Sequence, residues 1–246
     1  MTAPLDNVRS RLARQLLKYL FISTPESNPD QGNHEILEDI YLSLFGQNDL
    51  QVVELPDNIS AADFLYFLVN KQEFLFHGSN QSNIDMLTPR IQENYRGDEI
   101  SAVFASSDAI WAMFFAIIDR ERYQGSLRNG SFLLSRPGEM SERYYFFSIN
   151  REMLGNSPWR SGSVYILLRD SFNQSRTGIV RFDEWFSKEP VTPIAKIDIS
   201  SRDFPLFERV GTHNEGESIY LTWIKYKKRL KQEKMDIVSL RNNFKE

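Results

Sequence analysis

The sequence of 246 residues contains no cysteine and only three histidines, at positions 34, 77 and 213. The absence of cysteine excludes disulfide bonds, thiolate nucleophiles and cysteine-based zinc sites. The histidines are far apart and form no His-x-x-x-His pair, so no metal site is expected. No apolar run approaches the roughly 18–20 residues that span a bilayer, and the N-terminus lacks the layout of a signal peptide. These absences predict a cytoplasmic protein without a membrane segment.

Charge of one sign is not in large excess, whereas apolar and aromatic residues are abundant. The formal net charge is −4 and the pI is about 5.6, so no overall positive field attracts the chain to nucleic acid or to an anionic membrane. Hydrophobic residues make up 41% and aromatic residues 13%, which is enough for a sizeable core. The length predicts one large domain, or a main domain with a smaller appendage.

The first 70 residues differ from the rest in their predicted secondary structure, which is mainly helical. Apolar spacing and capping residues predict three helices and one short strand there, at about residues 8–20, 36–46 (ending at Gly46), 60–70 (capped by Ser60) and, for the strand, 50–55. A polar loop joins the first two helices. We therefore predict a helical N-terminal segment, residues 1–70, followed by a second domain, residues 71–246.

Short apolar strands separated by turns dominate from Glu73 onward. They are predicted at residues 74–77, 101–105, 130–135, 144–149, 163–169, 184–187 and 191–199. One helix, capped by Ser106 or Ser107, interrupts them. Many short strands with few helices predict an α+β fold with a largely antiparallel sheet.

A basic helix from about Ser218 to Lys234 ends the chain. Its lysines are interpreted first as the solvated face of an amphipathic helix, with a nucleic-acid contact surface as the alternative. His34 and His213 lie in polar surroundings and are expected at the surface.

The segment Phe76-His77-Gly78-Ser79 is the sharpest local feature. An apolar strand delivers one histidine to its end, where a glycine and a small hydroxyl residue follow. Glycine lets a ligand approach the backbone closely, and the histidine and serine supply hydrogen bonds. The tetrapeptide by itself more often marks a strand that ends in a turn with a half-buried histidine.

Two further segments combine small, aromatic and acidic residues. The strand at residues 102–107 leads into a helix that carries Phe114 and Phe115, and one of these rings is suited to stack on a planar ligand. In Asp183-Glu184-Trp185-Phe186, alternation places Glu184 and Phe186 on one face of a strand. A carboxylate that faces apolar groups needs a partner or a role, although a solvated glutamate at a strand end is the commoner case.

In order and spacing, the three segments together resemble the poly(ADP-ribose) polymerase and diphtheria-toxin branch of the ADP-ribosyltransferases. The matching pieces are His77-Gly78-Ser79, Val103-Phe104-Ala105-Ser106 with Phe114, and Asp183-Glu184-Trp185-Phe186. The resemblance covers roughly residues 73–204 and implies a core built on a split, mainly antiparallel sheet. It also implies NAD⁺ as the substrate.

Roles for individual residues follow from the resemblance. It implies that His77 hydrogen-bonds the ribose on the nicotinamide side and that the backbone of Gly78 binds the nicotinamide carboxamide. Ser79 would assist on the same ribose or amide. Glu184 would hold the ribose 2′-hydroxyl and stabilise the cation that develops when nicotinamide leaves.

The remaining implied contacts are aromatic and basic. Phe114, in preference to Phe115, would stack on the nicotinamide. The tyrosine in the middle of the family's pattern corresponds here to Val103 or Phe104, depending on the alignment by one residue, and either choice removes a hydroxyl group. Arg90, in the loop between the first two motif strands, is a candidate for the pyrophosphate, as is Arg96.

The implied function is that of a mono-ADP-ribosyltransferase that releases nicotinamide and modifies a macromolecular acceptor, as a bacterial toxin or defence effector does. Three alternatives stay open: a catalytically degenerate module that binds NAD⁺, ADP-ribose or a protein, an NAD⁺ glycohydrolase, and a plain interaction protein whose motif matches are accidental. The acceptor, protein or nucleic acid, stays undecided. Residues 1–70 lie outside the resemblance and are open to three roles: a regulatory cover, a docking unit for an inhibitory partner, and simple packing onto the main domain.

Overall fold

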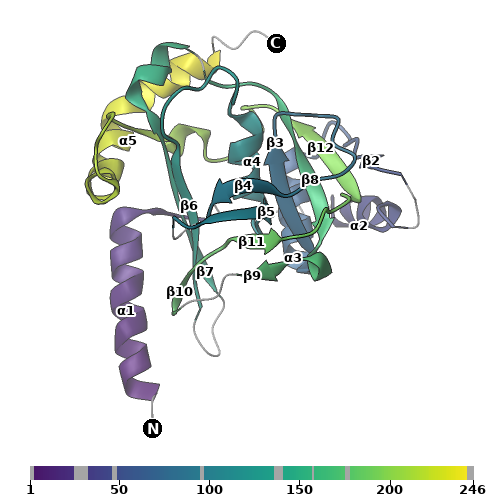
Figure 1. The fold of residues 1–246 in the computed structure, drawn as a ribbon, viewed down its shortest axis with the longest axis horizontal. Helices are drawn as coiled ribbons and strands as arrows, with labels where there is room; N and C mark the ends of the chain where they lie inside the picture. Colours follow the sequence, from purple (N-terminus) through teal and green to yellow (C-terminus); the bar gives the residue numbers. More distant parts are fainter. Residues whose placement is uncertain are drawn as a thin grey trace.

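A computed structural model describes residues 3–24, 33–45, 49–94, 97–135, 141–156, 158–174 and 178–242 of the chain. Within these residues, five α-helices and three β-sheets form an α+β fold (Figure 1). Most strand pairs are antiparallel, and the pairs β2–β12 and β7–β13 are parallel. The predicted fold class, α+β with largely antiparallel sheets, is therefore confirmed at this level.

The N-terminal segment packs against the rest of the chain. Its elements are α1 (Ala3–Leu20), β1 (Ile22–Ser23), α2 (His34–Ser43), β2 (Gln51–Val52) and α3 (Ala61–Lys71). Ser60 caps α3 as predicted, because its hydroxyl accepts a hydrogen bond of 3.1 Å from the backbone N–H of Asp63. β1 pairs with β7, and β2 pairs with β12. Gly46 lies outside the described residues, and the domain boundary at residue 70 stays a prediction.

Three sheets form the body of the molecule. The first has the order β1-β7-β6-β10, with β13 also on β7, and its later strands are β6 (Arg128–Leu134), β7 (Glu142–Asn150), β10 (Val180–Phe182) and β13 (Gly211–His213). The second has the order β4-β5-β11-β9, with the strands β4 (Arg90–Glu93), β5 (Glu99–Ala105), β9 (Asn173–Gln174) and β11 (Trp185–Ser187). The third has the order β2-β12-β8-β3, with the strands β3 (Phe74–Ser79), β8 (Gly162–Leu168) and β12 (Ala195–Ile199).

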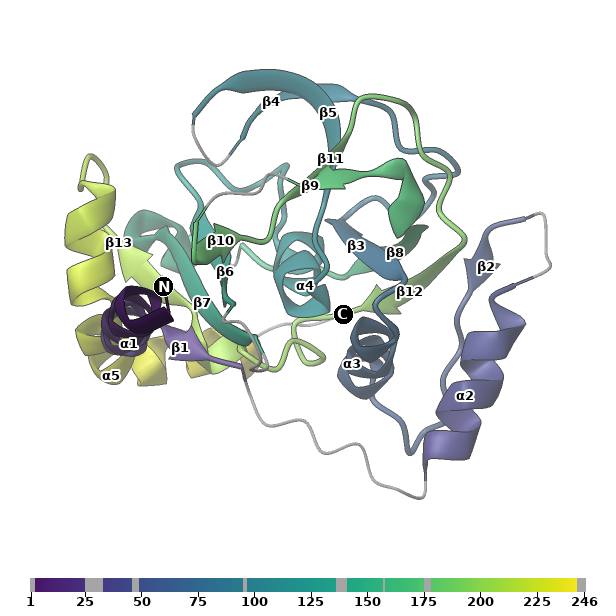
Figure 2. The same ribbon diagram turned by 90° about the horizontal axis from the view of Figure 1, so that it is seen from below.

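Helix α4 (Ala109–Ile117) lies at the centre of the molecule, between β6 and β7 on one side and β3 and β8 on the other (Figure 2). All its residues except Phe115 are buried, as expected of a helix that is apolar on every side. The prediction that Ser106 or Ser107 caps this helix is wrong. Asp108 is the cap, and its carboxylate accepts a hydrogen bond of 3.1 Å from the N–H of Ile110.

Two glycines allow α4 to approach the third sheet. A Cβ atom added to Gly78 would lie 1.8 Å from the carbonyl oxygen of Ala112, and one added to Gly162 would lie 2.1 Å from that of Ala116. The Cα of Gly78 therefore faces the backbone of the helix. This gives the glycine a packing role that the sequence motif did not reveal.

We expect Gly78→Ala to lower the free energy of unfolding by about 3 kcal/mol or more, because the methyl group overlaps backbone atoms that cannot rotate away. Urea unfolding measures the change. Gly216→Ala is the control, since Gly216 has a φ of +68° but open space around it. That change should cost only the left-handed backbone strain, about 1–2 kcal/mol. Equal losses in the two variants would contradict the packing role.

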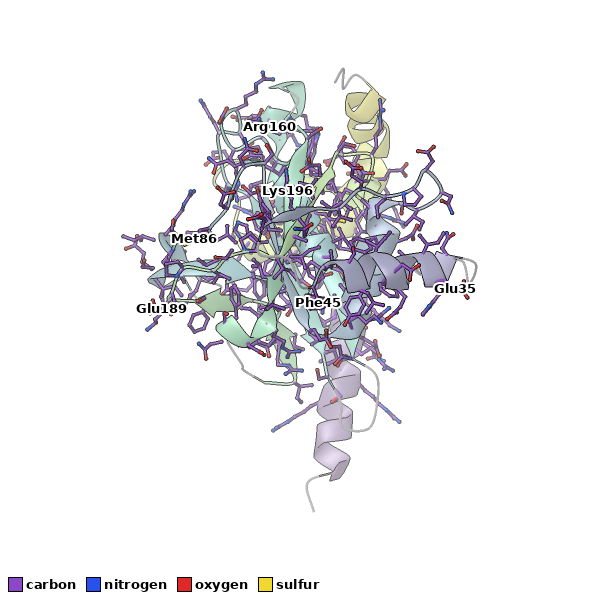
Figure 3. The ribbon with its side chains drawn as sticks, turned by 90° about the vertical axis from the view of Figure 1, so that its right-hand side faces the viewer. Glu35, Phe45, Met86, Arg160, Glu189 and Lys196 are labelled. Atoms are coloured by element: carbon purple, nitrogen blue, oxygen red, sulfur yellow. The ribbon has the colours of Figure 1, made fainter. Side chains whose placement is uncertain are left out.

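Helices α1 and α5 (Ile219–Asn242) pack on the outer face of the first sheet. The contact buries Leu17 and Phe21 of the N-terminal segment against Phe146 and Tyr226. The other face of α1 exposes the large side chains Val8, Leu12, Leu16 and Tyr19. This helix projects from the body of the molecule (Figure 3). No helix in the described part of the chain combines the length and apolarity needed to cross a membrane.

His213 is fully buried on β13, which corrects its expected place at the surface, whereas His34 is exposed as expected. The Nε2 atom of His213 lies 2.8 Å from the Ser126 hydroxyl, and its Nδ1 atom lies 2.9 Å from the Ser148 hydroxyl. Burial, and then the positive charge of Arg128, lower the pKa of His213 from 6.5 to about 4. The imidazole is therefore neutral in the folded protein at neutral pH.

This burial predicts a loss of stability in acid. The unfolded chain binds a proton at His213 below pH 6.5, whereas the folded chain does so only near pH 4. The stability is therefore fully present above pH 6.5 and falls as the pH approaches 4, by at most about 1.4 kcal/mol per pH unit. We expect His213→Gln to flatten this slope in urea unfolding, and His34→Gln to leave it unchanged. An unchanged slope in His213→Gln would contradict the assignment.

Candidate functional site

One cavity contains four of the residues that the sequence singled out. It has a volume of about 190 Å³ and lies where β3, β5, α4 and the β10–β11 connection meet. His77, Gly78, Phe104 and Glu184 line it together with Phe76, Gln92, Glu93, Ala105, Ser106, Trp111, Ala112, Phe115 and Arg120. The fold thus brings His77 and Glu184, which lie far apart in the sequence, to one enclosed space.

His77 is held in one orientation by β5. Its Nδ1 atom lies 2.7 Å from the carbonyl oxygen of Phe104, and because a carbonyl only accepts, Nδ1 carries the proton. Burial lowers the pKa of His77, and the charge of Arg90 lowers it further, against the opposing effect of the bond to Phe104. The imidazole is therefore neutral at neutral pH, and its Nε2 lone pair can accept a hydrogen bond from a ligand hydroxyl.

Gly78 offers backbone hydrogen-bonding groups on the side of β3 away from β8. The preceding Phe76 exchanges two backbone hydrogen bonds, of 2.8 and 3.0 Å, with Ser106 beyond the end of β5. In an antiparallel strand, the N–H and C=O groups of residues two apart point to the same side. The N–H and C=O groups of Gly78 therefore point the same way as those of Phe76, at the edge of the cavity that Gly78 lines.

Glu184 stands in the two-residue connection by which the chain passes from the first sheet to the second. The pairing of Trp185 with Ala105 and of Phe186 with Phe104 fixes this connection beside the end of β5. Glu184 is 8% exposed and lines the cavity, while the preceding Asp183 is completely buried and faces the protein interior. Strand alternation predicts these opposite orientations.

A buried network holds Asp183, and with it the backbone that carries Glu184. The carboxylate of Asp183 accepts hydrogen bonds from Ser107 (2.9 Å) and Trp185 Nε1 (3.0 Å), and it forms an ion pair with Arg143 of β7. Arg143 also lies 3.7 Å from the carboxylate of Asp108 at the start of α4. Burial raises the pKa of Asp108, and Arg143 opposes the rise. The network therefore joins the β10–β11 connection to β7 and to α4.

The aromatic lining corrects the prediction that Phe114 stacks on the ligand, and it decides between Val103 and Phe104 for the tyrosine position. Phe114 is completely buried, with its ring centroid 4.6 Å from that of Phe147, so it cannot stack on a ligand in the cavity. Each helical residue turns the side-chain direction by about 100°, and this turn points Phe114 toward β7 and Phe115 toward the cavity. Of the two candidates for the family's tyrosine position, Val103 is buried in the core, whereas Phe104 lines the cavity.

Trp111 and Arg120 are lining residues that the sequence did not single out. Trp111 precedes Phe115 by one helical turn, a spacing that places both rings on one face of α4. The guanidinium carbon of Arg120 lies 5.4 Å from the ring centroid of Phe115. Helical spacing from Phe115 would have predicted Trp111 as a lining residue. Arg120 follows the end of the helix, so helical spacing does not predict its position.

Ser79 and Arg90 are near the cavity but do not line it. Ser79 ends β3, and its hydroxyl accepts a hydrogen bond of 3.1 Å from the N–H of Gln81. Arg90 begins β4 with an exposed side chain, close enough to His77 to lower its pKa. Arg96 lies outside the described residues. Among the described residues, no three His, Asp or Glu side chains are grouped so as to hold a metal ion.

Comparison of the chain with models of protein families, with curated proteins and with solved structures found no match.

Proposed function

We propose that the protein binds NAD⁺ at this cavity and transfers its ADP-ribose to a macromolecular acceptor, with release of nicotinamide. One observation carries the proposal: His77, Gly78, Phe104 and Glu184 line a single cavity. They come from three motif segments whose order and spacing resemble those of ADP-ribosyltransferases. Segments chosen from sequence for one ligand would have no reason to meet if the resemblance were accidental.

The cavity suits one end of the dinucleotide. Its volume of about 190 Å³ is below the roughly 300–1,000 Å³ usual for a complete drug-sized ligand. In our proposal the nicotinamide ring enters between the aromatic side chains of Phe104 and Phe115. The N–H and C=O of Gly78 match the acceptor and donor groups of the carboxamide, and Nε2 of His77 accepts from a ribose hydroxyl.

Glu184 supplies the catalytic charge in this proposal. The bond between ribose C1′ and the nicotinamide nitrogen breaks, and its electron pair leaves with nicotinamide. The sugar becomes oxocarbenium-like, and the carboxylate of Glu184, on the 2′-hydroxyl, stabilises the positive charge. A nucleophile of the acceptor then forms a bond to C1′ and loses its proton.

Arg120 is the candidate to pair with the pyrophosphate, in addition to the exposed Arg90. It is a cation of the cavity lining, and guanidinium groups bind phosphate oxygens in pairs. Glu93, on the same lining, bears the opposite charge. A pyrophosphate held by Arg120 would leave the adenosine end of the dinucleotide outside the enclosed space.

Incubation with NAD⁺ labelled in the adenine ring, in the presence of cell extract, tests the proposal. Separation into protein, nucleic acid and small molecules should show label on a macromolecule, with nicotinamide released in parallel. Absence of both labelled product and nicotinamide over hours would contradict the transferase assignment.

Phe104 favours a second candidate function. It fills the place of the family's tyrosine without the hydroxyl group, which suits a module that binds NAD⁺ or ADP-ribose without catalysis. The same incubation separates the candidates, because such a module binds NAD⁺ in calorimetry but releases no nicotinamide. A glycohydrolase would instead yield free ADP-ribose and no labelled macromolecule.

A further inference from the structure

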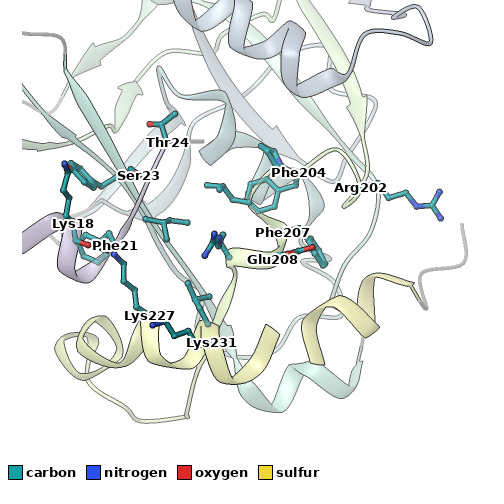
Figure 4. Close-up of a pocket in the computed structure, with 16 residues that line it drawn as sticks. Lys18, Phe21, Ser23, Thr24, Arg202, Phe204, Phe207, Glu208, Lys227 and Lys231 are labelled. Carbon is teal, nitrogen blue, oxygen red and sulfur yellow. Dashed lines mark hydrogen bonds between the residues drawn. The ribbon is translucent and has the colours of Figure 1, made fainter. Parts of the chain in front are cut away.

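A second and larger cavity, of about 960 Å³, lies among the C-terminal end of α1, β1, residues 202–209 and α5 (Figure 4). We call it the basic groove, because its lining contains the cations Lys18, Arg202, Arg209, Lys227 and Lys231. Glu208 is the one acidic residue in this lining among the residues that the structure describes. A chain with a net charge of −4 thus concentrates positive charge at one concave surface.

Three separate segments bring Lys18, Arg209, Lys227 and Lys231 together. The side chain of Arg202 points away from the labelled lysines (Figure 4). Lys227 and Lys231 are one turn apart on α5, and Lys18 lies across from them at the end of α1 (Figure 4). The ammonium group of Lys227 donates a hydrogen bond to the backbone carbonyl of Lys18, which ties the two helices together. Burial lowers the pKa of Lys227, and the charges of Arg209 and Lys231 lower it further. The like charges are therefore close enough to act on one another.

The apolar residues beneath the cations are buried in the protein core and expose little surface to the groove. Phe21, Phe204 and Leu230 are 3%, 2% and 6% exposed, respectively. Protein–protein interfaces take most of their affinity from large apolar or aromatic side chains that enter pockets, and this floor offers little such area. A ligand of the groove must instead bind mainly through repeated negative charge.

We propose that the basic groove binds the phosphate backbone of nucleic acid. Lysine and arginine ammonium and guanidinium groups, with serine and threonine hydroxyls, make most phosphate contacts in nucleic-acid complexes. The exposed Ser23 supplies such a hydroxyl at the groove edge, whereas the Thr24 hydroxyl donates to the backbone carbonyl of Arg143. The buried aromatic floor offers no ring on which a base can stack, so the contacts are limited to the phosphate backbone and binding should depend little on base sequence. This inference does not depend on the proposed NAD⁺ chemistry.

Fluorescence anisotropy with a labelled oligothymidylate tests the proposal. The test variant is Lys18→Glu/Lys231→Glu, both in the groove. The matched control is Arg11→Glu/Lys228→Glu, which changes exposed cations on the same two helices, outside the groove lining, by the same total charge. We expect at least a tenfold loss of affinity in the test variant and less than a threefold loss in the control.

The salt dependence supplies an independent measurement. Each phosphate contact on a single strand contributes about −0.7 to the slope of log K against log salt, so losing two contacts should make the slope less steep by about 1.4. Circular dichroism of all variants checks that α1 and α5 remain folded.

Two outcomes would overturn the proposal. Equal losses in the test and control variants would show that general electrostatics, and not the groove, binds the strand. Binding of oligoglutamate but not of oligothymidylate would assign the groove to an acidic protein. Failure of this proposal is distinguishable from failure of the proposed NAD⁺ chemistry. Glu184 does not line the basic groove, so Glu184→Gln should bind oligothymidylate as the unchanged protein does.

Discussion

The Glu184→Gln variant is expected to transfer ADP-ribose about 10²–10³-fold more slowly than the unchanged protein, which corresponds to about 2.7–4 kcal/mol in the barrier. The amide keeps the shape of the side chain but removes the charge that stabilises the oxocarbenium-like sugar in the proposed reaction. Glu184 lines the cavity beside the end of β5. Nicotinamide release at saturating NAD⁺ measures the effect, and the melting temperature should change little.

Glu93→Gln is the matched control, because Glu93 is a second carboxylate in the lining of the same cavity. It belongs to the exposed strand β4 and has no assigned contact with the ribose. We expect its turnover to stay within a few-fold of the unchanged protein. Full activity of Glu184→Gln, or equal losses in both variants, would contradict the role of Glu184.

The Arg143→Met variant is expected to lose about 3–5 kcal/mol of folding free energy. The side chain of Arg143 is 14% exposed and lies between the carboxylates of Asp183 and Asp108, which are 0% and 3% exposed. Removing the guanidinium group leaves the buried carboxylates of Asp183 and Asp108 without their neighbouring positive charge. Urea unfolding measures the loss. Arg122→Met is the control, because the pair of Arg122 with Asp119 is solvent-exposed on the arginine side and should contribute less than about 1 kcal/mol.

Two further measurements separate loss of charge balance from loss of packing. Adding Asp183→Asn to Arg143→Met removes one buried charge and should restore part of the stability. The deficit of Arg143→Met should also shrink as the pH falls, because the folded state then gains a proton on Asp108, whose pKa burial raises above that of the unfolded chain. A deficit that is independent of pH and of Asp183→Asn would contradict the electrostatic account.

Local sequence patterns predicted most of the strands, whereas the meeting of His77 with Glu184 was implied by the motif resemblance. Alternation of apolar residues marks strands because one face of each must be buried, and this rule placed β5, β6, β7 and β8 to within a few residues. The same rule placed Asp183 and Glu184 on opposite faces, and the structure shows Asp183 buried and Glu184 at the cavity. Strand positions and alternation depend on neighbours in sequence, so sequence alone contains them.

Other features depend on which elements pack together, and the sequence did not reveal them. Phe114 and Phe115 are chemically identical neighbours, and only the positions of β7 and the cavity decide which ring is available. Ser107 was expected to cap α4, but its hydroxyl binds Asp183, far away in sequence. The apolar residues Val8 and Leu12 recur at helical spacing, and yet they lie on the face of α1 that remains exposed.

The crystal structure of the Glu184→Gln variant with NAD⁺ is the most direct test, because this variant should bind the substrate without consuming it. We predict the nicotinamide ring in the smaller cavity, its carboxamide on the backbone of Gly78, and its ribose between Nε2 of His77 and the side chain at position 184. An NAD⁺ molecule seated in the basic groove, or a ribose out of reach of His77, would contradict the account.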